Sequence, residues 1–327
     1  MAKTSELFDK LYHYTTWDGL LGILQSQSLW ATHYKFLNDY SEIVLFRDKM
    51  VSLILPYVSE AYEKLIKMDP QAKQRIDGQG GLGHVVKHDT ETYVDAQYHV
   101  TGDEIYILSF CGQHKVPHIN NNGLLSQWRG YGAGGGFALE FNTKKLEDLL
   151  EIESYRYAYN TGHLSDLIYS DDDDKLKDEL SGDLSIIADA VKLMFDSMMT
   201  DDKLDEDAIS NSYVPFVNCI SRYKHCGFKE EKEVRIVALP TVMDQTIINM
   251  AMSDGLTLRP EKERKYRNQN GHHVPYIELF NSTDLELPIE KIIVGPHKDK
   301  DVRAATLRVM LNKTNIEVTC SDIPYVG

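Results

Sequence analysis

The chain of 327 residues contains few cysteines and no long apolar run, and both absences exclude classes of protein. Its four cysteines are scattered without a CxxC pair, which is typical of a reducing compartment and not of a fold held by disulfides. The longest apolar run, residues 50–58, contains Pro56 and is too short to cross a bilayer. The first ten residues have no apolar core, so no signal peptide is visible. We therefore expect a cytoplasmic protein without a membrane partner.

The sequence also lacks the motifs of several common enzyme classes. It contains no GxSxG elbow of a serine hydrolase and no HExxH helix of a zinc metalloprotease. The glycine-rich stretch 130–136 lacks the GK[ST] ending of a phosphate-binding loop, and it precedes a predicted strand where such a loop would precede a helix. Cys111, His114 and His118 have the spacing of metal ligands, but no nearby pair supplies the fourth ligand that structural zinc requires. We expect neither a P-loop nor a bound metal.

The formal net charge of −15 and the pI of about 5.2 limit the partners of this protein. An acidic surface repels a phosphate backbone, so broad, salt-driven binding of nucleic acid is disfavoured, although a locally basic cleft remains possible. The apolar share of 42% and the charged share of 26% are those of a globular chain with a substantial core.

Short apolar runs bounded by turn residues predict strands at 11–14, 28–31, 105–111, 137–141 and 231–239. Apolar residues at helical spacing predict helices at about 42–55, 59–67 and 213–226, and a mostly helical, acidic stretch at 144–212. Thr16 is a good N-cap for a further helix that carries an apolar stripe.

The C-terminal region predicts a βαβ unit. Strands at 289–294 and 316–320 flank a helix at 301–311, and a crossover of this kind makes the two strands parallel. We expect one catalytic-type domain over residues 1–327, with helical insertions at about 59–103 and 144–212.

An acidic pair at the start of the predicted strand 231–239 is the first candidate for chemistry. Alternate residues of a strand share a face, so Glu231, Glu233 and Arg235 would point together while Val234 points into the core. A solvated, salt-bridged strand face explains the same pattern and is the more common case.

Three other candidates have equally ordinary explanations when each is taken alone. His13 lies in an apolar-aromatic run, where a histidine is more often hydrogen-bonded and half-buried than catalytic. Trp128 and Tyr131 are ordinary core aromatics when taken singly.

Taken together and in order, these segments resemble a bacterial family known only as domain of unknown function 2971 (DUF2971). The resemblance spans nearly the whole chain and carries no activity with it. The matching segments are Leu11-x-His13-Tyr14-Thr15, Ile23-Leu24, Leu29-Trp30, Phe36-Leu37-Asn38-Asp39-x-x-Glu42, Ser109-Phe110, Gln127-Trp128-x-x-Tyr131 with Gly136-x-Ala138, Phe228-Lys229-x-Glu231-x-Glu233-x-Arg235, Ile293-Val294-Gly295-Pro296 and Ser321-x-Ile323-Pro324-Tyr325.

A weaker resemblance supplies chemistry. His-x-Thr before an Ile-Leu helix, followed by a tyrosine and then a glutamate strand, is similar to ADP-ribosyltransferases of the His-Tyr-Glu type. The resemblance implies that His13 and Thr15 bind the adenosine-side ribose of NAD, that Tyr131 stacks on nicotinamide, and that Glu233 is the catalytic carboxylate. It makes Glu231 an accessory acid and lets Arg129 bind the pyrophosphate. Tyr14, Trp128 and Asn38 complete the implied cofactor-binding set, and Asn38 could equally cap the helix that follows it.

These resemblances give the full expectation for fold and function. The fold is α+β, with a mixed, split sheet of short strands and flanking helices as in ADP-ribosyltransferases. The function is an NAD-consuming ADP-ribosyltransferase, a bacterial toxin or antiviral defence effector, which modifies a protein or an exposed nucleic-acid base and has a partner protein or antitoxin. The alternatives are a non-catalytic nucleotide-sensing or interaction module on the same scaffold, and a nucleotide- or nucleic-acid-processing enzyme.

Overall fold

The computed structural model describes residues 3–37, 40–101, 104–132, 134–170, 172–200, 210–253, 255, 257–269, 271–281 and 285–324. The chain divides into two compact units. The sheet unit contains Met1–Tyr34, Tyr106–Leu167 and Phe228–Gly327, and the helical unit contains Lys35–Ile105 and Ile168–Gly227. The expectation of one domain with two helical insertions stays a prediction.

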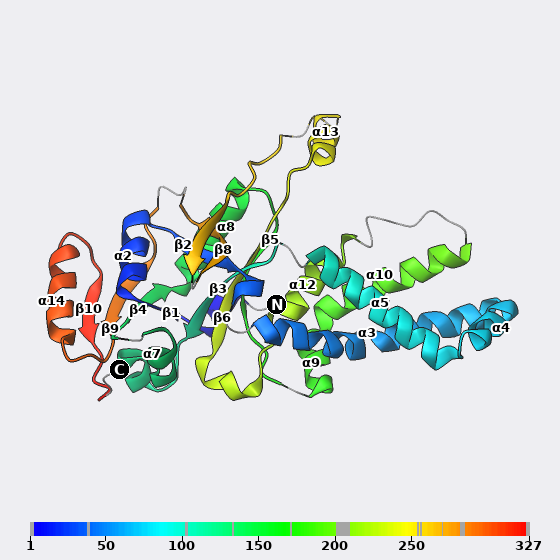
Figure 1. Cartoon of the computed structure of the whole chain (residues 1–327), viewed down its shortest axis with the longest axis horizontal. Helices are drawn as coiled ribbons and strands as arrows, with labels where there is room; N and C mark the ends of the chain where they lie inside the picture. Colours follow the sequence, from blue (N-terminus) through cyan, green and yellow to red (C-terminus); the bar gives the residue numbers. More distant parts are fainter. Residues whose placement is uncertain are drawn as a thin grey trace. The chain divides into compact units, whose positions relative to one another are not determined.

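All ten strands among the described residues belong to one sheet in the sheet unit (Figure 1). The main path runs in the order β10-β9-β4-β1-β3-β2-β8-β7, while β6 pairs with β3 and β5 pairs with β6. The strands are β1 (Lys10–Thr15), β2 (Leu29–His33), β3 (Tyr106–Gly112), β4 (Phe137–Asn142), β5 (Tyr159–Asp166), β6 (Glu233–Pro240), β7 (Arg264–Gln269), β8 (His272–Leu279), β9 (Ile289–Val294) and β10 (Glu317–Cys320).

The sheet forks at β3. One edge of β3 pairs with β6 from Tyr106 to Cys111. The opposite edge is shared, because β1 pairs with its end at Cys111 and Gly112, while β2 pairs with its beginning at Tyr106 and Ile107. The predicted α+β fold with a mixed, split sheet is therefore confirmed. So is the C-terminal βαβ unit, in which β9 and β10 are parallel and are joined through α14 (Lys300–Met310).

One face of this sheet carries the main apolar core. Alternate residues of each strand point to the same face, and helices α2 (Trp17–Ser26), α8 (Thr143–Arg156) and α14 cover them. Thr16 caps α2 as predicted, because its hydroxyl accepts a hydrogen bond from the backbone N–H of Gly19 at 3.3 Å. Members of this core include Leu11, Leu20, Phe110, Leu139, Leu149, Val234, Ile236 and Leu307.

The opposite face carries a smaller apolar cluster under α6 (Pro117–Asn122) and α7 (Leu125–Tyr131). Its centre is Trp128, which is fully buried and whose indole N–H donates to the carbonyl of Asn122 at 2.9 Å. Gly123, with φ of +78°, packs so closely on this indole that an added Cβ would lie 2.7 Å from the ring. A glycine is thus required there by both backbone conformation and space.

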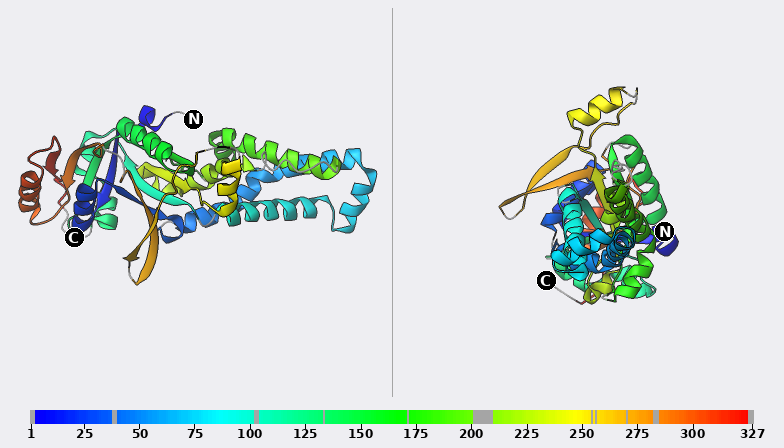
Figure 2. Two further views of the ribbon diagram at one scale, coloured as in Figure 1. Left: turned by 90° about the horizontal axis from the view of Figure 1, so that it is seen from above. Right: turned by 90° about the vertical axis from the view of Figure 1, so that its right-hand side faces the viewer.

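The helical unit consists of α3 (Tyr40–Met68), α4 (Pro70–Gly78), α5 (Leu82–Thr101), α9 (Asp173–Glu179), α10 (Ser181–Thr200) and α12 (Tyr213–Ser221). Within it, α3 packs lengthwise against α5 and α10 (Figures 1 and 2). Aromatic pairs join these helices, such as Tyr62 with Phe195 at a centroid distance of 5.0 Å. The predicted break at Pro56 is wrong, because α3 continues through it and keeps Ile54 and Val58 buried on either side. Burial of these residues outweighs the hydrogen bond that proline removes.

Three further element predictions need correction. Glu231 does not lie on a strand: it ends the 3₁₀ helix η2 (Cys226–Glu231), and β6 begins only at Glu233. Lys232 between them adopts a positive φ of +45°, which breaks the alternation that the sequence pattern assumed. The acidic stretch 144–212 contains strand β5, and the helix predicted at 213–226 ends at Ser221.

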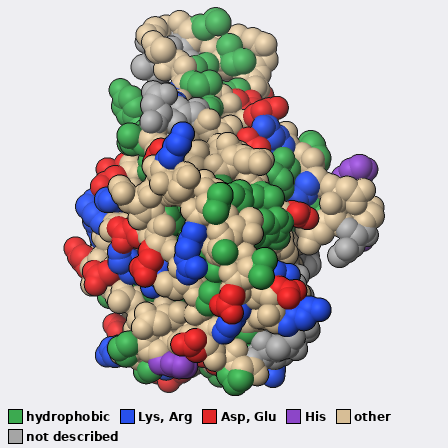
Figure 3. Space-filling view, turned by 90° about the vertical axis from the view of Figure 1, so that its left-hand side faces the viewer, with side chains coloured by type: hydrophobic (Ala, Val, Ile, Leu, Met, Phe, Trp, Pro, Cys, Tyr) green, Lys and Arg blue, Asp and Glu red, His purple; other side chains and the backbone are tan. Residues whose placement is uncertain are grey.

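The remaining short elements are α1 (Thr4–Leu7), η1 (Tyr34–Phe36) and α13 (Gln245–Ser253). On the end of the molecule that carries α14 and β10, acidic and basic side chains are interspersed around a central apolar area (Figure 3). In the described part of the chain, no helix combines the length and apolarity needed to cross a bilayer.

Candidate functional site

His13 lies on β1 at the point where the sheet forks. Its Nδ1 is 3.1 Å from the backbone carbonyl of Ser109 in the middle of β3, and its ring meets Phe110 edge-on at 5.7 Å. A carbonyl oxygen only accepts, so Nδ1 must carry the proton of this hydrogen bond. Burial lowers the pKa of His13 and outweighs the opposing effect of the Ser109 carbonyl. His13 is therefore a neutral imidazole whose Nε2 remains an acceptor.

Glu233 begins β6 and forms a buried ion pair on its own strand. The Arg235 Nε donates to Glu233 Oε1 at 2.7 Å, and the two residues are only 2% and 4% exposed. Both point to the same face of the sheet, as residues two apart on a strand must. The predicted common face of Glu233 and Arg235 is thus present, but it is buried and it excludes Glu231, which is half-buried ahead of the strand.

A row of polar residues crosses the sheet at the level of Glu233. Strand register places Glu233 opposite Cys111, Cys111 opposite Tyr12, Tyr12 opposite Glu140, and Glu140 opposite Lys291. Residues directly opposite one another share a face, so this row lies on the face of the smaller apolar cluster.

A second buried carboxylate lies in this row. Glu140 accepts from Lys291 Nζ at 2.6 Å and is hydrogen-bonded to the hydroxyl of Tyr12. Burial, followed by the charge of Glu140, raises the pKa of Tyr12, which therefore remains a protonated donor. Sequence inspection missed Glu140 and Lys291, because the pairing of β1, β4 and β9 cannot be read from a single strand.

Helix α7 is held against β1 by Tyr14. The Tyr14 hydroxyl accepts from the backbone N–H of Leu124 at 2.9 Å, and its ring meets Trp128 edge-on at 4.9 Å. This fixes the helix that ends with Arg129, Gly130 and Tyr131 over the face carrying the polar row. Tyr131 is 44% exposed, whereas Trp128 has no exposed surface and packs α7 against the sheet.

Tyr131 belongs to the glycine-rich stretch 130–136, yet it is helical and is the last residue of α7. Arg129 is exposed on the same helix. Thr15, half-buried at the end of β1, lies next to Gly19, where an added Cβ would clash with its hydroxyl. Asn38 lies outside the described residues.

The structure brings the predicted segments together but does not place all their side chains on one side. Strands β1, β3 and β6 are neighbours, and α7 covers the face shared by Tyr14 and Glu233. His13 alternates to the side of Leu11 and Leu139, at the fork. Among the described residues its recorded partners are Ser109 and Phe110, and neither Tyr131 nor Glu233 is one of them.

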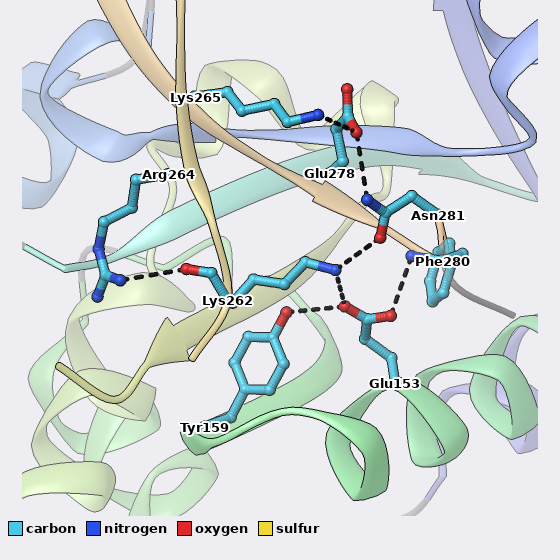
Figure 4. A network of polar contacts seen from close by, with 8 residues as sticks. All are labelled: Glu153, Tyr159, Lys262, Arg264, Lys265, Glu278, Phe280 and Asn281. Carbon is cyan, nitrogen blue, oxygen red and sulfur yellow. Dashed lines mark hydrogen bonds and ion pairs between the residues drawn. The ribbon is translucent and has the colours of Figure 1, made fainter. Parts of the chain in front are cut away.

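A separate buried network ties α8 to the β7–β8 hairpin (Figure 4). Lys262 Nζ lies 2.5 Å from Glu153 Oε1 and donates to Asn281 Oδ1 at 2.9 Å. Glu153 also accepts from the Tyr159 hydroxyl at 2.9 Å and from the backbone N–H of Phe280 at 3.1 Å. Lys262 Nζ also lies over the ring of Tyr157, 4.0 Å from its centroid. Because both oxygens of the Glu153 carboxylate are occupied, this network is a structural joint between α8 and the β7–β8 hairpin.

No metal site accompanies these groups: in the ranges that the structure describes, no three His, Cys, Asp or Glu side chains gather as metal ligands do. The residues predicted to bind a nucleotide lie on two sides of the sheet. His13 and Thr15 of β1 alternate to the side of Leu11 and Leu139, whereas Arg129 and Tyr131 belong to α7 over the opposite face.

Comparison with known proteins gives one match. No curated protein and no solved structure matches the chain. Residues 127–236 match the model of a family described as protein of unknown function (DUF2971), and this segment contains Trp128, Tyr131, Glu231 and Glu233. The resemblance to ADP-ribosyltransferases stays a prediction. The match supports the predicted resemblance to the DUF2971 family over residues 127–236.

Proposed function

We propose that this protein is an ADP-ribosyltransferase that cleaves the nicotinamide–ribose bond of NAD and transfers ADP-ribose to a macromolecular acceptor. The observation that supports this most is the convergence, around the fork of one sheet, of segments separated by more than a hundred residues: β1, β3 and β6 side by side, with α7 over the face that carries Glu233. A split sheet with a first-strand histidine and a glutamate strand is what the transferase resemblance implies.

The state of His13 suits a ribose. Its Nδ1 proton is committed to the Ser109 carbonyl, and its lowered pKa keeps the ring neutral. The free Nε2 can then accept a hydrogen bond from a ribose hydroxyl, which a protonated imidazole could not do. The role proposed for His13 is to position the sugar.

The proposed chemistry uses Glu233 as an electrostatic stabiliser. As the bond between C1′ and the nicotinamide nitrogen breaks, its electron pair leaves with nicotinamide and positive charge develops on the ribose. A fixed, buried carboxylate lowers the energy of that cation, and the hydrogen bond from Arg235 holds the carboxylate in its orientation. An acceptor lone pair then attacks C1′, and Glu231, half-buried ahead of β6, takes the acceptor's proton. Exposed Tyr131 stacks on the nicotinamide ring.

Release of nicotinamide from NAD tests the proposal directly. The purified chain, incubated with NAD and a cell extract as the source of acceptor, should release nicotinamide, and Glu233→Gln should lower the rate roughly 100- to 1,000-fold. Glu140→Gln is the matched control, since Glu140 lies in the same row, is 8% exposed and is also ion-paired. It should keep most of the activity. Equal loss in the two variants, or no release by the native chain with any extract, would sink the proposal.

A second candidate function is favoured by one observation. Glu233 is nearly sealed and engaged by Arg235, as expected of a scaffold that binds a nucleotide without turning it over. A sensing module of this kind would bind NAD in calorimetry and release no nicotinamide, and Glu233→Gln would leave the cellular phenotype unchanged. The two measurements separate the candidates.

A further inference from the structure

A cluster of aromatic and basic side chains lies on the β2–β8–β7 branch of the sheet, outside the residues proposed for NAD. The rings of Trp30 and Tyr276 are 4.4 Å apart and inclined by 32°. The Arg267 guanidinium carbon is 5.4 Å from the Trp30 ring and 5.8 Å from the Tyr276 ring. Arg267 also donates to the Thr32 hydroxyl at 3.1 Å. We call Trp30, Tyr276 and Arg267 the aromatic–arginine cluster.

The cluster presents an open aromatic surface. Tyr276 is buried and supports Trp30 from one side, yet Trp30 keeps 40% of its surface exposed. The other two tryptophans differ, since Trp128 is fully buried and Trp17 is half-buried against the main core. A large, rigid ring that is held in place by a second ring and left open to solvent is a ready stacking platform.

Among the described residues, no carboxylate forms an ion pair with Arg267. Its recorded partners are the Thr32 hydroxyl, the Gln269 amide oxygen and the two rings. Its partial burial lowers its pKa, which is the cost of a desolvated charge with no anion beside it.

The neighbouring cations of the same hairpin are already paired. Arg264 forms an ion pair with Glu261, and Lys265 pairs with Glu278 at 2.8 Å. Arg267 lies two positions from Lys265 on the same face of β7. Because Arg264 and Lys265 already have carboxylate partners, Arg267 is the residue of this strand whose charge an external anion would neutralise.

We propose that the aromatic–arginine cluster binds single-stranded nucleic acid, with one unpaired base stacked on Trp30 and one phosphate of the same strand on Arg267. A stacked base needs an open π-face, and its adjoining phosphate needs a cation within a few ångströms; the cluster supplies one of each. A duplex hides its base faces and cannot use this platform. The acidic chain does not oppose a contact of this size, because a single phosphate is neutralised and not a long backbone.

The register places this cluster on the same side of the sheet as Glu233. Thr32 lies opposite Tyr276 on β8 and opposite Ile107 on β3, and Ile107 lies two residues before Ser109, the partner of Arg235. The binding proposal does not depend on the transferase proposal, because it concerns different side chains and is measured without NAD.

Fluorescence anisotropy with a labelled single-stranded oligothymidylate tests the proposal. Trp30→Ala should weaken binding roughly 5- to 150-fold, the usual effect of losing one base–aromatic stack, while Trp30→Phe retains most of the affinity. Tyr266→Ala is the matched control: Tyr266 lies beside Arg267 on β7 and is 67% exposed, but it alternates to the other face. Melting temperatures of all variants show whether Trp30→Ala remains folded, and Trp30→Phe decides the matter if it does not.

The salt dependence tests the phosphate contact separately. Replacing Arg267 by Gln should reduce the slope of log affinity against log salt by about 0.7, the value for one phosphate of a single strand. Arg264→Gln removes a paired cation and should leave the slope unchanged. Equal binding of duplex and single strand, equal losses for Trp30→Ala and Tyr266→Ala, or full competition by free thymidine monophosphate would each overturn the proposal.

Discussion

Two buried carboxylate–cation pairs in the sheet unit differ in what they connect. Glu153 and Lys262 come from α8 and from the segment before β7, and they draw in Tyr159, Phe280 and Asn281 from other elements. The recorded ion pair of Glu233, by contrast, is with Arg235, two residues along the same strand. A pair that joins distant elements stabilises the fold, whereas a pair within one strand chiefly orients its own carboxylate. The contacts of Glu153 and Lys262 therefore make that pair a structural joint between elements, whereas the ion pair of Glu233 with Arg235 links two residues of one strand. The second arrangement is compatible with the catalytic role proposed for Glu233.

Breaking the joint should have the largest effect on stability. Lys262→Met leaves the Glu153 carboxylate buried without its cation, so we expect the free energy of unfolding to fall by about 3–5 kcal/mol. Urea unfolding followed by circular dichroism measures the loss.

The double variant Glu153→Leu with Lys262→Met sharpens this result. Replacing both partners by apolar residues removes the orphaned charge, so much of the lost stability should return. Lys265→Met, which breaks the more exposed pair with Glu278, is the control and should change the midpoint far less. If Lys265→Met lowered the free energy of unfolding as much as Lys262→Met does, burial of the Glu153–Lys262 pair would not explain its effect on stability.

Glu233→Gln should cost less stability than Lys262→Met. The glutamine amide oxygen can still accept from Arg235 Nε, so the change removes a charge from the bond and not the bond itself. We expect a loss of about 1.5–3 kcal/mol in the same urea experiment, together with the loss of nicotinamide release proposed above. If Glu233→Gln lost as much stability as Lys262→Met, the pair of Glu233 with Arg235 would stabilise the fold as strongly as the pair of Glu153 with Lys262.

The pH dependence of stability should separate His13 from exposed histidines. Its folded pKa lies below the ordinary value of 6.5, so the unfolded chain binds the proton more readily. Stability contributed by neutral His13 is therefore fully present above that value and is lost as pH falls from it toward the folded pKa. His114, whose pKa burial also lowers, contributes in the same direction.

Unfolding midpoints at about pH 7.5 and pH 5.5 test this expectation. His13→Gln should reduce the difference between the two midpoints, because the glutamine does not titrate. His88→Gln, on the exposed surface of α5, should leave the difference unchanged. If both variants behave like the native chain, the burial of His13 at the fork does not govern its protonation.

The sequence predicted those parts of the fold that depend on local pattern. The strand around His13, the Thr16 cap and the C-terminal βαβ unit all rest on alternation, capping or periodicity within a few residues. The prediction of a helix break at Pro56 was wrong because packing on both sides of this residue overrides the tendency of proline to end a helix. The β7 strand was missed because its residues, half of them charged and none of them buried, carry no apolar alternation.

The candidate site could be predicted only in part, for a different physical reason. Motif order identified the segments of His13, Tyr131 and Glu233, but the register between strands decides which side chains share a face. A shift of one residue in the pairing of two strands moves each side chain to the opposite face of the sheet. The partners Glu140, Lys291 and Lys262 come from strands and loops that the motif does not contain, so no local signal could have revealed them.

The smallest expected effect comes from an ion pair that joins two elements but lies on the surface. Lys64 of α3 and Asp196 of α10 are 2.7 Å apart in the helical unit, and both side chains are exposed. Water already solvates these charges, so Lys64→Ala should change the free energy of unfolding by less than about 1 kcal/mol, and added salt should shrink even that difference. Connection of distant elements therefore stabilises only when burial accompanies it. A loss near that of Lys262→Met, independent of salt, would show that connection alone is sufficient and that the local pair at Glu233 must be reinterpreted.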